Sequence, residues 1–338
     1  MPSLAAIVAL LGAVIPLTAQ RANVKSARTG IAPKTPDGQP DLQGTWLNRS
    51  PTPLERPAVL KDRLTLTNAE VVELRRRAER IFGSGRSDFA LPDDVFLAAL
   101  ANVEVFKSPT STCTADAIAN FEFDNRTSLI VDPPDGRLPP YTAEGQRRRT
   151  QSLIANQLSN GATRADELSA LQRCISYGIP RLERRDGINS YCQIVQSRGY
   201  VVLLMEAVHE TRIIPLDGRP HVPPGVRSWS GDSRGRWDDK TLVIDTTNFS
   251  SARNFLGSAD GLHLIERLTR VAPDEIRYEI RIDDPSTWTA PWTALLRLKR
   301  TDERIFEYAC HEGNSQVMES MLSGIVGNPK NSGVRKEK

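Results

Sequence analysis

The sequence predicts a mainly β fold with α-helical additions in its N-terminal half, in which an antiparallel meander forms a β-barrel of about eight strands. From about Ser190 onwards, apolar residues recur at every second position in short runs separated by turn residues, a pattern typical of antiparallel strands. Before that point, apolar residues recur at helical spacing instead. Roughly eight short strands suffice to close a small barrel with room for one ligand.

The clearest strand signal lies between Glu275 and Ile282, where Ile and Tyr alternate with Glu and Arg. This alternation indicates that one face of the sheet is in water. Gly231–Phe249 is typical of a hairpin with a tight turn at Asp238 to Lys240, because Asp tolerates the backbone angles of tight turns. We expect the barrel strands at Tyr191–Gln196, Tyr200–Pro215, Ser233–Trp237, Thr241–Phe249, Leu262–Val271, Glu275–Ile282, Thr293–Arg300 and Arg304–Cys310.

The residues before the barrel predict a first strand followed by helices. Asp41–Trp46 is typical of a strand entry, and its Gly-x-Trp is typical of the opening strand of lipocalin-like (calycin-type) barrels. We therefore expect a barrel of that type. Thr67 and Glu70 form a capping box ahead of apolar residues at helical spacing, which predicts a helix that begins at Thr67. Further helices are expected from Asp93 to about Val105 and in two pieces within 143–175, with a strand at Thr127–Asp132.

The first twenty residues have the length and composition of a signal peptide. Leu4–Leu17 is an apolar run too short to span a bilayer comfortably, and Ala19 offers a small residue for cleavage. We therefore expect a periplasmic or secreted protein with no membrane span in the mature chain. The expected organisation is a signal peptide at 1–20, a flexible lead-in at 21–40, first strand(s) with a helical subdomain at 41–187, the barrel at 188–314 and a C-terminal tail at 315–338.

Four cysteines, Cys113, Cys174, Cys192 and Cys310, would meet an oxidising compartment after export. An even number of cysteines there predicts one or two disulfides, and four cysteines allow three full pairings. No Cys-x-x-Cys occurs in the sequence, so a zinc ribbon or a thioredoxin-type site has no support.

Charge and motifs exclude several classes of function. The net charge is +3, and the basic runs Arg75–Arg77 and Arg147–Arg149 lie beside acidic residues without interleaved aromatic ones, which argues against nucleic-acid binding. The sequence has no phosphate loop, no Gly-x-Gly-x-x-Gly and no Gly-x-Ser-x-Gly, so nucleotide enzymes, Rossmann dehydrogenases and elbow hydrolases are excluded. The histidine spacings match no compact ligand motif, so we expect neither a metal nor a cofactor.

Three histidines of the barrel region, His209, His263 and His311, are the candidate catalytic residues. His209 lies in an alternating apolar row within Tyr200–Pro215. If that row faces inward, its imidazole is a polar group in an apolar lining, which needs a partner and can titrate near neutral pH. His311 directly follows the last expected strand, and Asn314 comes after it as either a turn residue or a ligand contact.

The segment Leu262–Arg267 leaves two inward-facing sets open. Either His263 and Arg267 point into the barrel, or Glu266 and Arg270 do.

Arginines and tryptophans are the candidate ligand-binding residues. Arg212 and Arg219 could hold an anionic or carbonyl group, although the Asp-Gly-Arg turn around Arg219 also has a purely structural explanation. Trp288 and Trp292 lie in one loop and could form an aromatic platform for a sugar or an aromatic ligand, or could cap the end of the barrel.

Seven segments of the sequence carry a resemblance to a known group of proteins. They are Pro40–Trp46, Arg126–Arg137, Arg212–His221, Gly231–Trp237, Thr241–Phe249, Asp284–Trp292 and Tyr308–Asn314. Together they resemble a widespread family of exported bacterial proteins of unassigned function, over nearly all of the expected mature chain. The resemblance implies export and a Cys174–Cys310 disulfide, and it implies no particular activity.

Two departures from that family's pattern are Cys192 and the segment between Ser84 and Asn125, which carries Cys113. They suggest an extra Cys113–Cys192 disulfide as a hypothesis.

Three interpretations of the function remain open from the sequence, the third of which is an envelope interaction module with no pocket. The first is an exported protein that binds a small, partly apolar or aromatic molecule in the barrel pocket. The alternative is a cofactor-independent lyase, hydrolase or isomerase that uses histidine acid–base chemistry in the same pocket, because such reactions need little beyond a poised histidine and an oriented substrate. The expected partner in both is a small-molecule ligand or substrate.

Overall fold

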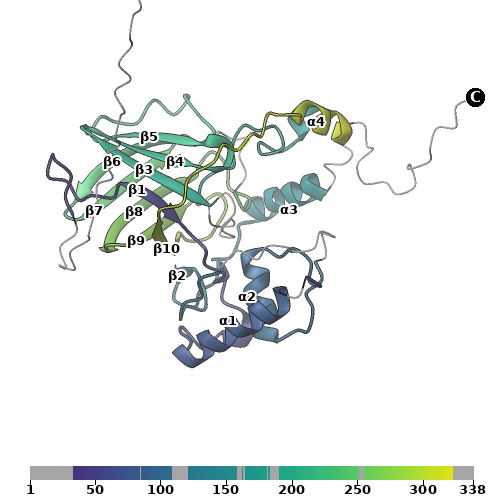
Figure 1. Ribbon diagram of the computed structural model, residues 1–338. Helices are drawn as coiled ribbons and strands as arrows, with labels where there is room; N and C mark the ends of the chain where they lie inside the picture. Colours follow the sequence, from purple (N-terminus) through teal and green to yellow (C-terminus); the bar gives the residue numbers. More distant parts are fainter. Residues whose placement is uncertain are drawn as a thin grey trace, which may run out of the picture. The chain divides into compact units, whose positions relative to one another are not determined.

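The computed structural model describes residues 33–83, 85–108, 121–157, 162, 164–180, 182, 190–250 and 255–322. Within them, ten antiparallel strands form one sheet and four α-helices accompany it (Figure 1). The predicted mainly β class is therefore confirmed. The strands are β1 (Gly44–Leu47), β2 (Ile130–Asp132), β3 (Tyr191–Ser197), β4 (Tyr200–Met205), β5 (Thr211–Pro215), β6 (Asp232–Asp238), β7 (Thr241–Thr247), β8 (His263–Ala272), β9 (Glu275–Asp283) and β10 (Trp292–Thr301). The helices are α1 (Asn68–Phe82), α2 (Pro92–Ala101), α3 (Ala143–Gln157) and α4 (Asn314–Leu322).

The expected signal peptide lies outside the described residues, as do the lead-in up to residue 32 and the tail after residue 322. No helix in the described part of the chain is both long and apolar enough to cross a bilayer.

The order of strands along the sheet is β5-β4-β3-β1-β10-β9-β8-β7-β6, and β2 pairs with β10 beside this path. Most neighbours are consecutive hairpins, as the turn residues predict. The exception is β1, which comes first in the chain yet lies between β3 and β10. Thr45 pairs with Gln193 on one side and with Thr301 on the other. The first strand therefore joins the two hairpin series into one sheet.

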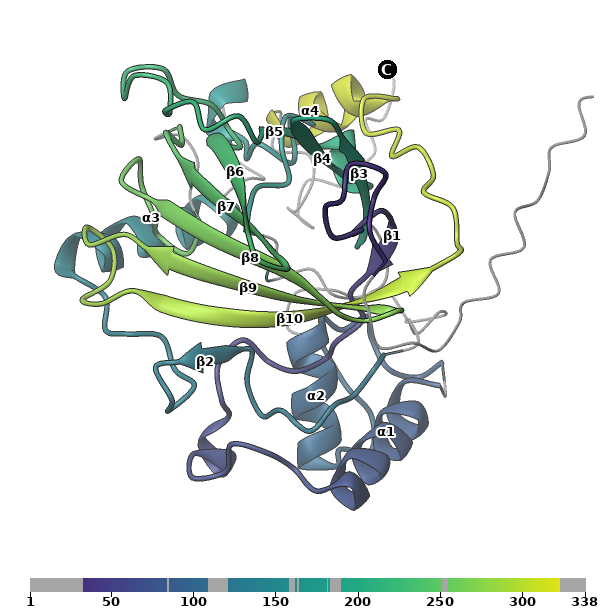
Figure 2. The same cartoon turned by 90° about the vertical axis from the view of Figure 1, so that its left-hand side faces the viewer.

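The sheet curls on itself but stays open. Residues from distant strands, such as Leu203 on β4 and Ile244 on β7, share one buried cluster, and the edge strands β5 and β6 lie next to each other (Figure 2). Gly235 on β6 is so close to β5 that a Cβ there would come within 2.8 Å of Ile214 Cγ2. Nevertheless, no backbone hydrogen-bond ladder joins β5 to β6 among the described residues. The sheet is therefore open, and the expected closure into an eight-stranded barrel is not seen.

Most of the expected strands are present. The Asp238-Asp-Lys240 turn is confirmed, because Asp238 pairs with Thr241 and Asp239 has φ of +50°, as a tight hairpin turn requires. On β9 the buried residues alternate along the strand with more exposed charged ones, as the alternation between Glu275 and Ile282 predicts.

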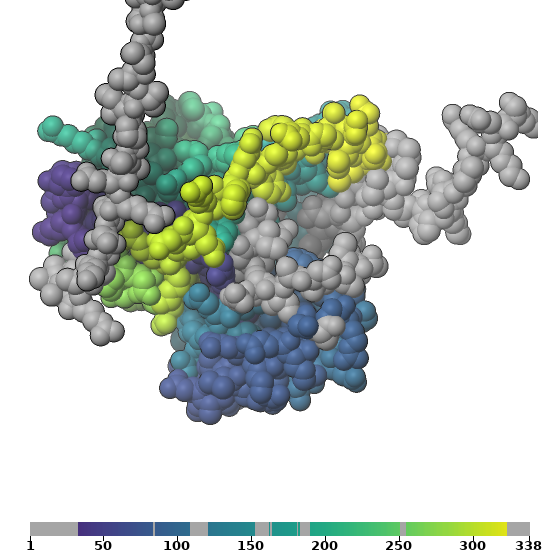
Figure 3. Space-filling model, in the orientation of Figure 1, coloured from purple at the N-terminus to yellow at the C-terminus, as the bar shows by residue number. Residues whose placement is uncertain are grey.

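Two strand predictions are wrong. The predicted strand Tyr200–Pro215 is interrupted after β4, where a 3-10 turn, η4 (Ala207–His209), separates β4 from β5. Val208 and His209 adopt positive φ there, which no strand tolerates. The segment Arg304–Cys310 forms no strand and is largely exposed. After β10 the chain leaves the sheet and lies across the surface (yellow in Figure 3).

The residues between β1 and β2 form a helical layer with its own core. Thr67 caps α1, since its side chain accepts from the Glu70 amide and the Glu70 carboxylate accepts from the Thr67 amide. The predicted capping box is thus confirmed. The second helix is also present, although α2 begins at Pro92 instead of Asp93 and ends at Ala101 instead of about Val105. Buried residues of α1 and α2, among them Ile81 and Phe96, pack together in one cluster. Of the two helical pieces expected within 143–175, only α3 is an α-helix, and the described remainder forms a 3-10 turn, η3 (Ala165–Glu167), and turns.

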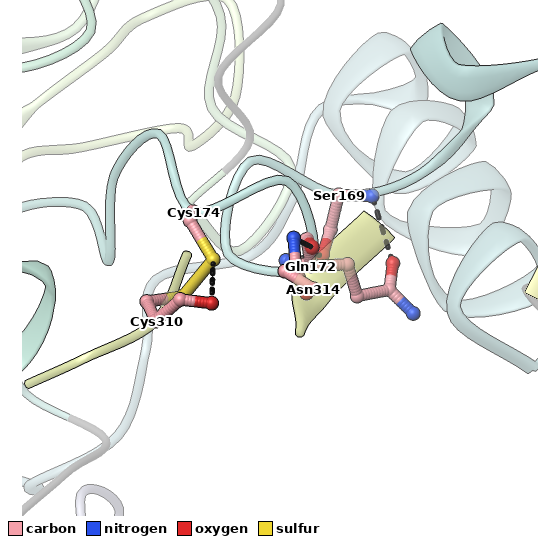
Figure 4. The surroundings of a disulfide bond; sticks show 5 residues. All are labelled: Ser169, Gln172, Cys174, Cys310 and Asn314. Carbon is pink, nitrogen blue, oxygen red and sulfur yellow. Dashed lines mark hydrogen bonds between the residues drawn. A yellow bond between two sulfur atoms is a disulfide. The ribbon is translucent and has the colours of Figure 1, made fainter. Parts of the chain in front are cut away.

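A disulfide joins Cys174 to Cys310 and fastens the C-terminal segment to the turns before β3 (Figure 4). Beside it, the Asn314 side chain donates to the Gln172 carbonyl at 3.0 Å. The pairing implied by the family resemblance is therefore present. Cys113 lies outside the described residues, and Cys192 is buried on β3, so the second proposed disulfide stays a hypothesis.

Candidate functional site

The buried face of the sheet encloses a partly open cavity of about 50 Å³. Its wall is mainly aliphatic, with side chains from β4, β8 and β10 and from the turns before β3: Ile179, Leu203, Met205, Leu268, Leu296 and Leu298. Its polar residues are Asn48, Ser190, Arg212 and Tyr278. A small, mostly apolar cavity with a few placed polar groups is the usual form of a small-molecule site.

Arg212, which lines this cavity, forms a buried ion pair with Glu266. The Arg212 guanidinium is on β5 and donates to both carboxylate oxygens of Glu266 on β8, at 2.9 and 2.5 Å. The two side chains are 4% and 0% exposed, so water does not solvate either charge. Alternation along β8 places Glu266 and Arg270 inward. Of the two sets that the sequence left open, the structure therefore has this one inward, and His263 and Arg267 face outward.

Further polar groups complete the network around this ion pair. The Arg212 guanidinium also donates to the hydroxyls of Ser233 on β6 and Thr246 on β7, at 2.9 and 3.0 Å. The Tyr278 hydroxyl on β9 donates to the Glu266 carboxylate. Arg212 therefore connects β5 to three strands at the other end of the sheet by side-chain hydrogen bonds, across the gap where no backbone ladder forms.

Both members of the pair are held in their charged forms. Burial alone would raise the pKa of Glu266, but the Arg212 charge and its hydrogen bonds hold that pKa below the ordinary value. Burial lowers the pKa of Arg212, and the Glu266 charge more than offsets this and raises it. Burial, followed by the Glu266 charge, raises the pKa of Tyr278 well above its ordinary value, so the phenol stays protonated.

One nitrogen of the Arg212 guanidinium has no partner. The Nε–H of Arg212 is buried and has no hydrogen-bond partner within the described part of the chain. A buried donor without an acceptor costs about 1–3 kcal/mol, so this nitrogen lowers the net stability that the network contributes.

The candidate catalytic histidines do not lie at this cavity. The predicted inward position of His209 is wrong, because the residue is exposed at positive φ in η4, where the strand row is broken. His311 is exposed in the turn before α4, and His263 is on the outer face of β8, beside Asp245. Because His221 is also elsewhere, none of the four histidines lines the cavity.

The other candidate ligand residues lie away from the cavity as well. Arg219 is exposed and pairs with Asp217 in its own turn, and Arg267 pairs with Asp238 on the outer face. Asn314 begins α4, near the disulfide.

Trp288 and Trp292 are 1% and 0% exposed and pack edge to face, with ring centroids 5.6 Å apart. They stabilise the core as a pair and present no open aromatic platform.

A group of four titratable side chains on the outer face was missed by the sequence reasoning. Asp245 on β7 lies between two histidines, with its Oδ1 2.9 Å from His263 Nε2 and 3.2 Å from His221 Nε2. His221 Nδ1 in turn lies 2.7 Å from Asp232 Oδ2. The only signal in the sequence was that Asp245 and His263 occupy outward positions on consecutive strands, and their proximity depends on the β7–β8 register.

No group of three or more His, Cys, Asp or Glu side chains that could hold a metal ion occurs among the residues described above. Comparisons of the chain with protein-family models, with curated proteins and with solved structures find no match.

Proposed function

We propose that this protein is an exported, periplasmic or secreted binding protein that takes up a small, partly apolar molecule inside a lipocalin-like curled sheet. The observation that carries the proposal is a mainly aliphatic cavity lined by Arg212, whose charge is buried and paired with Glu266. Buried ion pairs contribute little net stability, because desolvation of both charges offsets their attraction. A role in recognising a ligand accounts for charged groups at this position better than a role in stability does.

The curl of the sheet supports the lipocalin-like part of the proposal. Strands from both ends contribute to one core cluster, and Arg212 links β5 to β6, β7 and β8 through side chains. A cavity of about 50 Å³ holds a group of only a few heavy atoms. A longer ligand would therefore insert one end and leave the rest at the opening.

The alternative function, a cofactor-independent lyase, hydrolase or isomerase, needs a histidine at the cavity. Because all four histidines lie elsewhere, we favour binding over histidine acid–base catalysis in this pocket.

Ligand-detected saturation-transfer NMR tests the proposal, with toluene and cyclohexanone as small probes. Leu298 lines the cavity, so Leu298→Phe fills part of it and is expected to reduce the transfer signal of both probes at least severalfold. Val271 is 53% exposed on β8, and Val271→Phe serves as the matched control that adds the same ring outside the cavity. Circular dichroism checks that both variants fold. Equal signals from all three proteins would contradict the proposal.

A further inference from the structure

The segment Asp302–Ala309, between β10 and the disulfide, contains no helix, turn or bend and is largely exposed (yellow in Figure 3). Contacts along its length hold it in place. The Glu303 carboxylate accepts a hydrogen bond from Arg49 at 3.1 Å, and the Phe306 amide donates to the Glu206 carboxylate at 3.3 Å. The disulfide fixes its C-terminal end. The segment is therefore a nearly straight stretch of chain at the surface, and it belongs to none of the described strands.

The composition of this segment favours a strand. Ile305, Phe306 and Tyr308 are β-branched or aromatic residues, which are enriched in strands. The sequence predicts a strand at Arg304–Cys310, which the single chain does not form. The Phe306 ring is also 73% exposed, an unusual place for so large an apolar side chain. A segment with strand propensity and no strand beside it is a template for pairing with another chain.

The direction of the main chain leaves one edge of the segment unpaired. In an extended chain, the main-chain groups of successive residues point to opposite sides. The Phe306 amide points to Glu206, so the amides and carbonyls of Ile305 and Glu307 point to the opposite side. Within the described part of the chain, neither of these two residues makes a main-chain hydrogen bond. Their groups therefore form an edge that can accept a further strand.

We infer that this segment pairs with the same segment of a second copy of the chain, as an antiparallel ladder in which Phe306 lies opposite itself. A two-fold symmetric pairing of two identical strands requires one residue on the axis. Phe306 takes a position without ladder hydrogen bonds, which its amide allows because it points to Glu206. Ile305 then lies opposite Glu307 of the second copy, and their main-chain groups form the hydrogen-bonded pairs on either side.

The side chains are complementary to themselves in this register. Arg304 lies opposite Tyr308 of the second copy, so a guanidinium meets an aromatic ring on each side of the axis. The two Phe306 rings meet at the axis itself, where cross-strand aromatic pairs are favourable. Identical segments supply every one of these contacts. This self-complementarity is the reason to assign the edge to a second copy of the chain and not to an unrelated strand.

The neighbouring symmetric registers bring like charges together. With Glu307 on the axis, the two Glu307 carboxylates would lie opposite each other. With Ile305 on the axis, Glu303 would lie opposite Glu307 of the second copy. Like charges directly opposite each other destabilise a ladder, so only the register centred on Phe306 avoids this cost.

The pairing is expected to be reversible and to stop at two copies. A ladder of so few residues buries little area, and interfaces below about 1,200 Å² in total belong to weak or transient complexes. Both copies use the same edge, so a dimer leaves no edge of this kind for a third copy.

Sedimentation equilibrium of the full chain from about 10 µM to 1 mM tests the pairing. The mass is expected to rise with concentration from that of one chain toward that of two. Ile305→Pro removes an amide of the ladder and is expected to weaken the dimer by about tenfold or more. Asp302→Pro is the control, because it places the same ring in the same exposed segment outside the paired residues. Circular dichroism checks that both variants fold.

Disulfide cross-linking tests the register. Residues opposite each other without ladder hydrogen bonds have Cα atoms about 4.5 Å apart, which a disulfide can span. Phe306→Cys is therefore expected to link two copies through residue 306 under mild oxidation. In Arg304→Cys the two new thiols lie on residues about 13 Å apart along the ladder, so no such link is expected. Peptide mapping without reductant identifies the linked residues.

The results that would overturn the inference are specific. A monomer at every concentration, or a mass that grows beyond two chains, contradicts a closed pair. A dimer that is as stable in Ile305→Pro as in the wild type uses another surface. Equal cross-linking of Phe306→Cys and Arg304→Cys contradicts the register. The cross-linking variants keep the inference testable if Ile305→Pro does not fold.

Discussion

Asp245 accepts a hydrogen bond from His263 Nε2 at 2.9 Å, on the outer face where β7 and β8 run side by side. Both side chains are about one-third exposed, so the contact is partly screened by water. Its effect on titration is mutual. The hydrogen bond from His263 holds the pKa of Asp245 below its ordinary 3.8. The hydrogen bond to Asp245 raises the pKa of His263 above its ordinary 6.5, against the burial that lowers it.

This contact predicts a pH window for stability. The His263 contribution is fully present below pH 6.5 and is lost as pH rises through the raised folded-state pKa. The Asp245 contribution is present above pH 3.8 and is lost as pH falls through the lowered folded-state pKa. The difference in free energy of unfolding between wild type and His263→Gln is therefore expected to be largest between about pH 4 and 6.5.

Urea denaturation at a series of pH values from 3 to 9 measures this difference in the free energy of unfolding. The range brackets the ordinary pKa values of both groups. His311→Gln is the control, because His311 is exposed. A difference that grows steadily above pH 7 would contradict the assigned direction of the His263 shift.

Removal of one partner of the buried Arg212–Glu266 pair is expected to destabilise the protein strongly. Glu266→Leu leaves the Arg212 charge buried without compensation, which costs about 3–5 kcal/mol. The double variant Arg212→Met, Glu266→Leu removes both charges and is expected to be more stable than the single one. Guanidinium denaturation of the three proteins gives the comparison.

The exposed pair of Arg267 and Asp238 on the same sheet supplies the control for that experiment. These side chains are 39% and 55% exposed, so Arg267→Met is expected to change stability by no more than about 1 kcal/mol. A double variant as unstable as Glu266→Leu would show that the network has structural roles beyond charge pairing.

The approach of β6 to β5 depends on the absence of a side chain at Gly235. A Cβ there would lie 2.6 Å from Leu216 Cδ2 and 2.8 Å from Ile214 Cγ2, closer than van der Waals contact. Gly235→Ala is therefore expected to lower the free energy of unfolding by about 1–3 kcal/mol, as overpacking does. Gly225→Ala is the control, because nothing lies within 4 Å of a Cβ at that position. Equal stability of the two variants would mean that the two strands separate easily.

The disulfide between Cys174 and Cys310 closes a loop across 136 positions of sequence. Replacement of both residues by alanine is expected to cost roughly 2–5 kcal/mol, since the unfolded chain loses a long-range constraint. Thermal unfolding of the oxidised protein, the reduced protein and the double variant measures this. Reduction of the disulfide in the wild-type protein is expected to destabilise it as much as the double replacement does. Peptide mapping without reductant that pairs either cysteine with another thiol would contradict the assignment.

The fold was predictable where one local rule decides the structure. The alternation of Ile276, Tyr278 and Ile280 with charged residues predicts β9, and the capping box at Thr67 predicts the start of α1, because each depends on residues close together in the chain. The break at Val208 and His209 was not predictable, since the alternating pattern continues through it and only the positive φ of both residues ends the strand.

The site was predictable only in part, because its members come from different strands. Arg212 and Glu266 were each candidates from their own segments, yet their pairing depends on the curl that brings β5 opposite β8. The apolar row around His209 predicts an inward side chain, but the residue is exposed because the strand is interrupted there. No pattern in a single segment could have placed Asp245 between His221 and His263, since three separate segments meet there.

The position of β1 has a consequence for folding during synthesis. Gly44–Leu47 emerges early during synthesis, but one of its two neighbours is β10, among the last segments to appear. Until β10 is made and Thr301 pairs with Thr45, one edge of β1 stays unpaired and open to other chains. Nascent chains that stop short of β10 are therefore expected to aggregate.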